Sequence, residues 1–244
     1  MQSYPLRRSS DLVSRDKFIE DDSIISGPNK EDLDAVVADM KKANLGVTVE
    51  GTLEDFLGGN INRRKYGSIH LTQHHIIDQI VKDLGQDNPK NTSKSTTAQP
   101  SKISHSHKQS ENSDKKFHYR PVVGKLNYLE KCFRPDITYA KHQCDRLSVN
   151  PKRQHAKSLR HLGRQLKGTM DKGTIYFPNT DKGSEVHVDF DFAGNWDKED
   201  SENTDTAISR HGFVISYKGF PIVWKSSLHT EISLSSTESE YTGL

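Results

Sequence analysis

The sequence of 244 residues has little cysteine and no long apolar run. Its two cysteines, Cys132 and Cys144, are too few for a disulfide framework, and their separation is not that of metal ligands. No segment approaches the ~18 apolar residues that a membrane helix needs, and the N-terminus lacks the apolar stretch of a signal peptide. We therefore expect reduced thiols in an intracellular protein of the cytoplasm or nucleus, with no membrane partner.

Apolar side chains are scarce as well, because hydrophobic residues make up 32% of the chain, charged residues 28%, and the mean hydropathy is −0.81. This composition favours modest cores joined by polar segments over one large core. Residues 91–117 consist mainly of Ser, Thr, Lys, Asn and Gln. Such a segment buries too little apolar surface to offset its ordering entropy, so we predict a flexible linker there.

Periodicity predicts the order of the secondary structure. A hairpin with an acidic tip is predicted at residues 17–27. Apolar residues then recur at helical spacing in five segments, which are residues 29–45, 72–84, 122–132, 137–148 and 151–168. From residue 185 the pattern favours strands, with a hairpin that turns near Lys218 and Gly219. A last helix should begin with a capping box, either Ser235 with Glu238 or Thr237 with Glu240.

Charge is distributed unevenly although the net charge of the chain is only +2. Between residues 120 and 167 there are twelve Lys or Arg and three acids, a net charge of +9. Between residues 185 and 205 there are eight acids and one Lys, a net charge of −7. A basic helical stretch followed by an acidic strand suits a protein that holds a phosphate backbone beside metal-binding carboxylates. A solvated helix surface and an acidic loop would give the same pattern.

Two groups of carboxylates are candidates for metal binding. In “VHVDFDFAGNWD” the alternation places Asp189 and Asp191 on one strand face, where they repel each other unless they face water or a cation. The opposite, apolar face is predicted to be buried. Glu240 follows on the first turn of the last helix, and the adjacent Asp21 and Asp22 could share a divalent cation at the hairpin tip. The alternatives are a polar turn, a solvent-facing strand and a helix cap.

Seven segments, taken in order, resemble the Pol polyprotein of copia-type retrotransposons, from the end of its reverse transcriptase into its RNase H domain. They are “FIEDDSIISG”, “LEDFLGGNI”, “GSIHLTQHHIIDQIVKDLG”, “YRPVVGKLNYLEKCFRPDITYA”, “LRHLGRQLKGTMDKGTIYF”, “VDFDFAGNWD” and “LSSTESEY”. The resemblance covers roughly residues 17–90 and 118–244. Departures from the family pattern include Ile19, Glu20, Gly59 and Phe133.

The resemblance implies an α+β fold, in which a reverse-transcriptase palm and thumb remnant precedes an incomplete RNase H-like mixed sheet. The implied domains are the end of the palm, the linker at residues 91–117, a basic helical thumb or connection, and the N-terminal part of an RNase H-like domain. Apart from the linker, their bounds are residues 1–90, 118–180 and 181–244.

The resemblance also assigns functional residues. Asp21 and Asp22 match the paired metal-binding aspartates of the polymerase, and Asp189 and Glu240 match RNase H carboxylates, which implies Mg²⁺ or Mn²⁺ as the cofactor. Asp191 is expected to face solvent or to be structural. The basic helices match the part that grips an RNA/DNA hybrid or duplex, and the residues concerned are Arg153, Lys157, Arg160, Arg164 and Lys167.

The chain begins just before the paired aspartates and stops inside the last predicted helix. The resemblance implies a fragment of an RNA-directed DNA polymerase with RNase H, and we expect further ligands of both metal sites to lie outside the chain. Because phosphoryl transfer depends on well-positioned metal ions, we expect no measurable activity from the chain alone. Other Pol segments are then possible partners. The alternative hypotheses are a non-catalytic nucleic-acid-binding module and a non-functional translated remnant.

Overall fold

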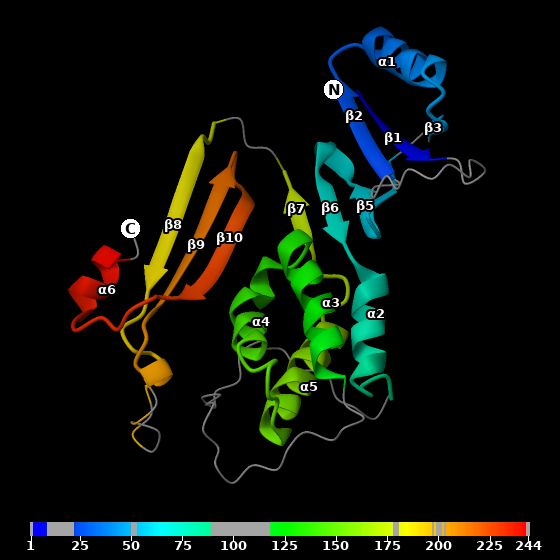
Figure 1. The fold of residues 1–244 in the computed structure, drawn as a ribbon. Helices are drawn as coiled ribbons and strands as arrows, with labels where there is room; N and C mark the ends of the chain where they lie inside the picture. The colour runs from blue at the N-terminus through cyan, green and yellow to red at the C-terminus, as the bar shows by residue number, and fades with distance from the viewer. Residues whose placement is uncertain are drawn as a thin grey trace. The chain divides into compact units, whose positions relative to one another are not determined.

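The computed structural model describes residues 2–8, 22–49, 53–88, 118–177, 181–196, 198, 202 and 204–242 (Figure 1). Asp21 and the predicted linker at residues 91–117 lie outside the described residues. The chain divides into two compact units, residues 1–62 and 63–244. None of the helices in the described ranges has the length and apolar character needed to cross a membrane.

The first unit combines small antiparallel strand pairings with one helix. Its strands are β1 (Gln2–Arg8), β2 (Asp22–Gly27), β3 (Val47–Val49), β4 (Asp55–Phe56) and β5 (Gly59–Arg63). The first three form a sheet in the order β2-β1-β3, and β4 pairs with β5. Helix α1 (Lys30–Lys42) lies within the helix predicted at residues 29–45, contacts β2 and buries its apolar residues Leu33 and Val37.

Four helices and a strand pair form the core of the second unit. The helices are α2 (His74–Asp83), α3 (Tyr119–Cys132), α4 (Thr138–Asp145) and α5 (Arg153–Lys167). Strand β6 (Ile69–Thr72) pairs with the distant β7 (Thr174–Tyr176). The core joins α2, α3 and α5, and its fully buried members include Ile77, Ile80, Leu126, Leu129, Leu159 and Leu166. Thus α2 packs with helices that follow the predicted linker, while the predicted domain boundaries stay predictions.

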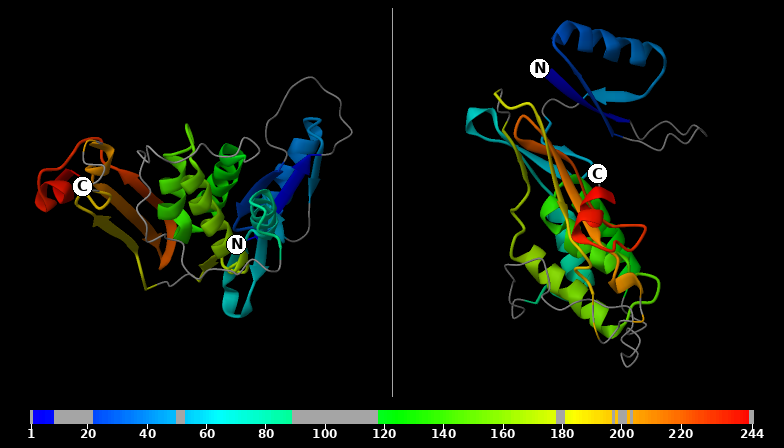
Figure 2. Two further views of the ribbon diagram at one scale, coloured as in Figure 1. Left: turned by 90° about the horizontal axis from the view of Figure 1, so that it is seen from below. Right: turned by 90° about the vertical axis from the view of Figure 1, so that its left-hand side faces the viewer.

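A three-stranded sheet of order β10-β9-β8 completes the second unit. Its strands are β8 (Ser184–Phe190), β9 (Arg210–Tyr217) and β10 (Phe220–Leu228), and helix α6 (Ser236–Thr242) follows. The turn between β9 and β10 is at Lys218 and Gly219, as predicted, and both have positive φ angles. The sheet lies beside α4, which contacts β10 (Figure 2). Trp224 of β10 donates its Nε1 hydrogen to Glu130 of α3, at 3.1 Å from the carbonyl oxygen.

The mixture of helices and antiparallel sheets confirms the α+β class, but two details of the predicted sheet are wrong. First, this sheet is not mixed, since β8 pairs with β9, and β9 with β10, in antiparallel fashion. The short hairpin between β9 and β10 reverses the direction of the chain. Second, the apolar side of β8 is not buried: Val186 is 62% and Val188 49% exposed. No described helix covers this side of the edge strand.

Candidate nucleic-acid interface

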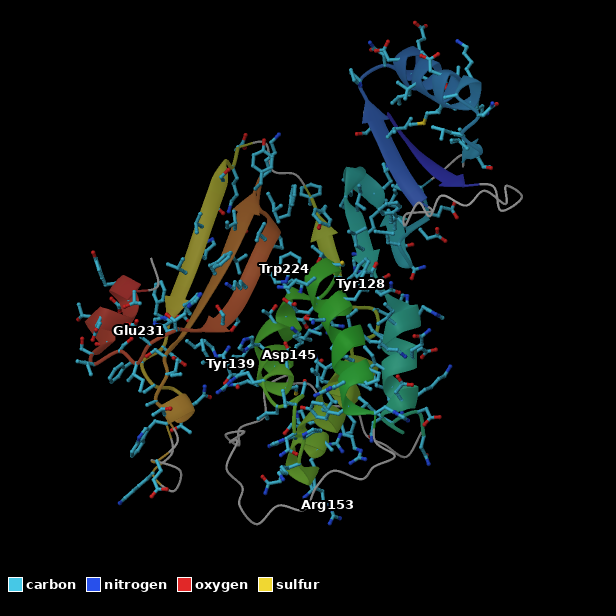
Figure 3. The ribbon with its side chains drawn as sticks, viewed as in Figure 1. Tyr128, Tyr139, Asp145, Arg153, Trp224 and Glu231 are labelled. Carbon is cyan, nitrogen blue, oxygen red and sulfur yellow. The ribbon has the colours of Figure 1, made fainter. Side chains whose placement is uncertain are left out.

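Helix α5 separates apolar and basic residues onto different sides. Its buried side is formed by His155, Ala156, Ser158, Leu159, Leu162, Gly163, Gln165 and Leu166. Four cations follow one another at intervals of four, three and four residues, and we call them the α5 cationic stripe: Arg153, Lys157, Arg160 and Arg164. This spacing keeps them on one side of the helix. Figure 3 shows the first of them, Arg153, at the N-terminal end of α5.

Several other cations of the basic segment are already neutralised within the protein. The ion pairs are Lys125–Asp83 at 2.8 Å, Lys131–Glu130 at 3.4 Å, Arg134–Asp136 at 2.7 Å and Lys141–Asp145 at 3.4 Å. Lys167, at the end of α5, donates to the carbonyl oxygens of Gln86 and Asn88 at 2.9 and 2.8 Å. It thereby holds the chain that follows α2. Much of the charge counted in the sequence therefore stabilises the fold.

Within the α5 cationic stripe, Lys157 and Arg164 have no such ion pair among the described residues. Lys157 is exposed and makes no hydrogen bond or ion pair within the described ranges. Arg153 is exposed, and Arg160 and Arg164 are half-buried. The Nε of Arg164 has no acceptor among the described residues. That Nε atom is itself buried, so a phosphate would have to be bound by the terminal nitrogens of this half-buried guanidinium.

Asp189 lies on β8, opposite Gly212 of β9. Its side chain is exposed and accepts no hydrogen bond from a described residue. The pairing of strands and the alternation of side chains place it on the same sheet side as Trp224, which packs on α3. Asp189 is thus accessible to a ligand from solvent.

Asp191 has the structural role that was one of its two predicted alternatives. Its Oδ1 accepts the backbone N–H of Arg210 at 2.6 Å, and its backbone N–H donates to the carbonyl of the same residue at 2.9 Å. Gly194 lies so close that a Cβ there would overlap the Asp191 carboxylate. The sequence Asp191 to Gly194 therefore builds the turn that ends β8, and a side chain at position 194 would push the Asp191 carboxylate out of this arrangement.

Helix α6 is attached to the same turn. The hydroxyl of Ser239 donates to the carbonyl of Asp191 at 2.7 Å, and α6 lies at the end of β8 (Figure 1). Of the two predicted capping boxes the structure forms half of the first: the backbone N–H of Glu238 donates to Ser235 Oγ at 3.1 Å, but the Glu238 carboxylate accepts the backbone N–H of Leu234 rather than that of Ser235. Glu240 is exposed on this helix. The elements that carry Asp189 and Glu240 therefore meet.

The described residues do not complete a metal site. They contain no group of three or more His, Cys, Asp or Glu side chains arranged to hold a metal ion. Asp21 lies outside the described residues. Asp22 begins β2, where its backbone pairs with Arg7, but its side chain is also outside the described part. The predicted metal roles of Asp21, Asp22, Asp189 and Glu240 stay predictions.

Sequence reasoning missed a buried basic cluster around Arg210, at the start of β9. Arg210 as a whole is 6% exposed, and its guanidinium donates from Nη1 to His142 Nδ1 at 2.9 Å and lies 5.1 Å from the ring centre of Tyr139. Burial, followed by the charge of Arg210, lowers the pKa of His142 to about 4. The cluster fixes the sheet to α4. Nothing in the sequence around Arg210 distinguishes it from an exposed strand residue.

The chain has relatives among transposon proteins. The retrovirus-related Pol polyprotein from transposon TNT 1-94 of Nicotiana tabacum is 26% identical over 225 residues, which is 91% of this chain and 16% of that protein. The corresponding protein from transposon RE1 of Arabidopsis thaliana is 32% identical over 50% of this chain and 8% of its own length. An uncharacterized mitochondrial protein of Arabidopsis thaliana is 28% identical over 92% of this chain and 87% of its own length.

The chain thus spans less than a fifth of the Pol polyproteins that it matches. No family model and no solved structure matches it. The similarity to the transposon proteins, which includes transposon RE2 of Arabidopsis thaliana at 27% identity over 98% of this chain, agrees with the motifs identified in the sequence. The chain is a homologue of one section of the retrovirus-related Pol polyproteins of copia-type transposons, which confirms the family predicted from those motifs.

Proposed function

We propose that this section of a Pol polyprotein binds the backbone of a duplex nucleic acid, an RNA/DNA hybrid in particular, through the α5 cationic stripe. The observation that carries this proposal is the regular row of four cations on a helix whose opposite side is buried in the core. Binding to phosphates by such a row is independent of base sequence and weakens steeply with salt, because each contact releases a counterion.

The salt dependence gives a quantitative test. Four phosphate contacts predict a slope of roughly −3.6 for the logarithm of the binding constant against the logarithm of the salt concentration. Affinity should then fall roughly 150-fold between 50 and 200 mM salt. Fluorescence anisotropy of a labelled hybrid, measured over this range with two unrelated base sequences, gives the slope and the sequence dependence together. A flat dependence on salt would refute the proposal.

Matched variants locate the contact surface. Replacing Lys157 and Arg164 by Gln should reduce the slope by about 1.8, since two of the four contacts are lost. The control replaces Lys42 of α1 and Lys82 of α2 by Gln, because both are exposed and lie outside the stripe. The control changes the net charge equally and should leave the slope nearly unchanged. Equal losses in both variants would show that only overall charge matters.

A catalytic role in RNase H-like phosphoryl transfer is the second candidate. It is supported by the attachment of α6, which carries Glu240, to the end of β8, which carries Asp189. The described residues lack a complete set of ligands for Mg²⁺ or Mn²⁺, so we expect the chain by itself to bind a hybrid without cleaving it. Cleavage of the RNA strand by purified protein with either metal, abolished by Asp189→Asn, would establish this second function instead.

A further inference from the structure

A pocket in the second unit has charged and apolar walls and lies outside the α5 cationic stripe. Its volume is about 450 Å³. It is lined by Arg64, by His70 of β6, by the turn at residues 134–136, by residues 171–175 at the start of β7, and by Pro221 of β10. Gly173 lets these walls approach, because a Cβ there would overlap the carbonyl of Leu71.

The two carboxylates of the pocket are already occupied. Asp136 accepts from the buried Arg134 through both oxygens, at 2.7 and 2.8 Å from Nε and Nη2. The remaining Arg134 donors reach the carbonyl and hydroxyl of Thr169, each at 3.0 Å. Asp171 accepts from His74 at 3.0 Å. The Arg134–Asp136 pair therefore adds no net charge and acts as a rigid wall.

Two cations of the pocket, Arg64 and Lys172, have no ion pair among the described residues, although the carboxylate of Asp171 also lines the pocket. Arg64 Nη2 donates to Nδ1 of His70 at 2.8 Å, which requires the neutral ring. Burial of His70, followed by the charge of Arg64, lowers the pKa of that ring and keeps it neutral. Lys172 is exposed, and neither it nor Arg64 has a carboxylate partner within the ranges that the structure describes. His70 thus orients Arg64 without reducing its charge.

We propose that this pocket binds the phosphate monoester of a nucleotide. Arg64 and Lys172 offer two cations to a monoester, which carries close to −2 at pH 7, and the guanidinium of Arg64 can bind it through two parallel hydrogen bonds. With Asp136 and Asp171 included, the formal charges of the lining residues sum to +1, so the pocket attracts an anion. Pro135, Ile175 and Pro221 offer apolar contacts to the sugar or base, and the volume lies within the range of small-ligand sites. A free nucleotide and the 5′-phosphorylated end of a strand present the same group.

Two binding measurements distinguish these sources. Anisotropy compares short labelled oligonucleotides with and without a 5′-phosphate, and calorimetry measures a nucleoside 5′-monophosphate alone. A preference for the phosphorylated strand supports a strand end, and binding of the monophosphate supports a free nucleotide. If the 5′-phosphate makes no difference and the monophosphate does not bind, the proposal is overturned.

Variants assign any such binding to the pocket. Arg64→Gln and Lys172→Gln should each weaken it roughly tenfold or more, because each removes a charged hydrogen-bond donor, while Lys82→Gln on α2 should leave it unchanged. Both residues are exposed, so the variants should fold, which circular dichroism checks. The double variant Lys157→Gln, Arg164→Gln should weaken the binding of a strand but preserve the binding of the monophosphate. Failure of the α5 proposal can therefore be distinguished from failure of the pocket proposal. Unchanged binding in both pocket variants would place the phosphate elsewhere and overturn the proposal.

Discussion

Two glycines inside helices of the second unit should respond with opposite signs to the same substitution. Gly124 is exposed on α3, and a Cβ added there would meet no atom within 4 Å. Gly163 is buried on α5, and its Cβ would overlap the Cδ1 atom of Leu84, which is itself only 3% exposed. The pair therefore separates intrinsic helix propensity from core packing.

The magnitudes follow from these two surroundings. Alanine is about 1 kcal/mol more favourable than glycine inside a helix, so Gly124→Ala should raise the free energy of unfolding by about that amount. At Gly163 the same gain is opposed by overpacking, which costs about 1–3 kcal/mol when neighbours are confined. Because Leu84 is packed in the core, we expect Gly163→Ala to lower the free energy of unfolding by about 1 kcal/mol.

Urea unfolding followed by far-ultraviolet circular dichroism measures both variants against the unchanged protein. A double-mutant cycle with Leu84→Ala tests the assigned contact. Removing Leu84 alone should cost about 2–5 kcal/mol, but less beside an alanine at position 163, with a coupling energy of about 0.5–3 kcal/mol. If Gly163→Ala stabilises the protein as much as Gly124→Ala, or if the cycle is additive, the described packing of α2 on α5 is refuted.

Two further predictions concern titrating groups. Burial and the charge of Arg210 lower the pKa of His142 from 6.5 to about 4. The folded protein therefore binds this proton only at a lower pH than the unfolded chain does. The contribution of His142 to the free energy of unfolding should be complete above pH 6.5 and should fall by at most about 3 kcal/mol as the pH drops to 4. Urea unfolding at several pH values should show a smaller loss in the His142→Gln variant. An equal loss in the variant would contradict the assignment of this pH dependence to His142. Burial raises the pKa of Cys144 to about 12 and also raises that of the half-buried Cys132. A maleimide at pH 8 should thus modify Cys132 slowly and Cys144 only after unfolding, and fast modification of both would contradict their burial.

Local patterns in the sequence predicted several elements well. The leucines of α5 recur at helical spacing, and the structure buries them in the core. The turn at Lys218 and Gly219 follows from a single glycine between two apolar runs. The order of the motifs was enough to predict the family, which the relatives confirm.

Other features depend on contacts between distant residues and could not be predicted. The side chain of Lys167 holds the chain that follows α2 rather than adding to the exposed charge, and nothing in its position on α5 distinguishes it from Lys157. The exposure of Val186 and Val188 also contradicts the alternation that predicted a buried side. Alternation specifies which residues share a side of a strand, whereas burial requires another element to cover that side.

The sequence by itself thus determined the helices, the β9–β10 hairpin, the α5 cationic stripe and the family, because each depends on spacing within a short segment or on motif order. Only the tertiary structure decided which cations are neutralised, that Asp191 builds a turn, and that Arg64 and Lys172 line one pocket. These properties arise where segments separated by up to about a hundred residues pack together, and close packing there fixes partners that no local pattern encodes.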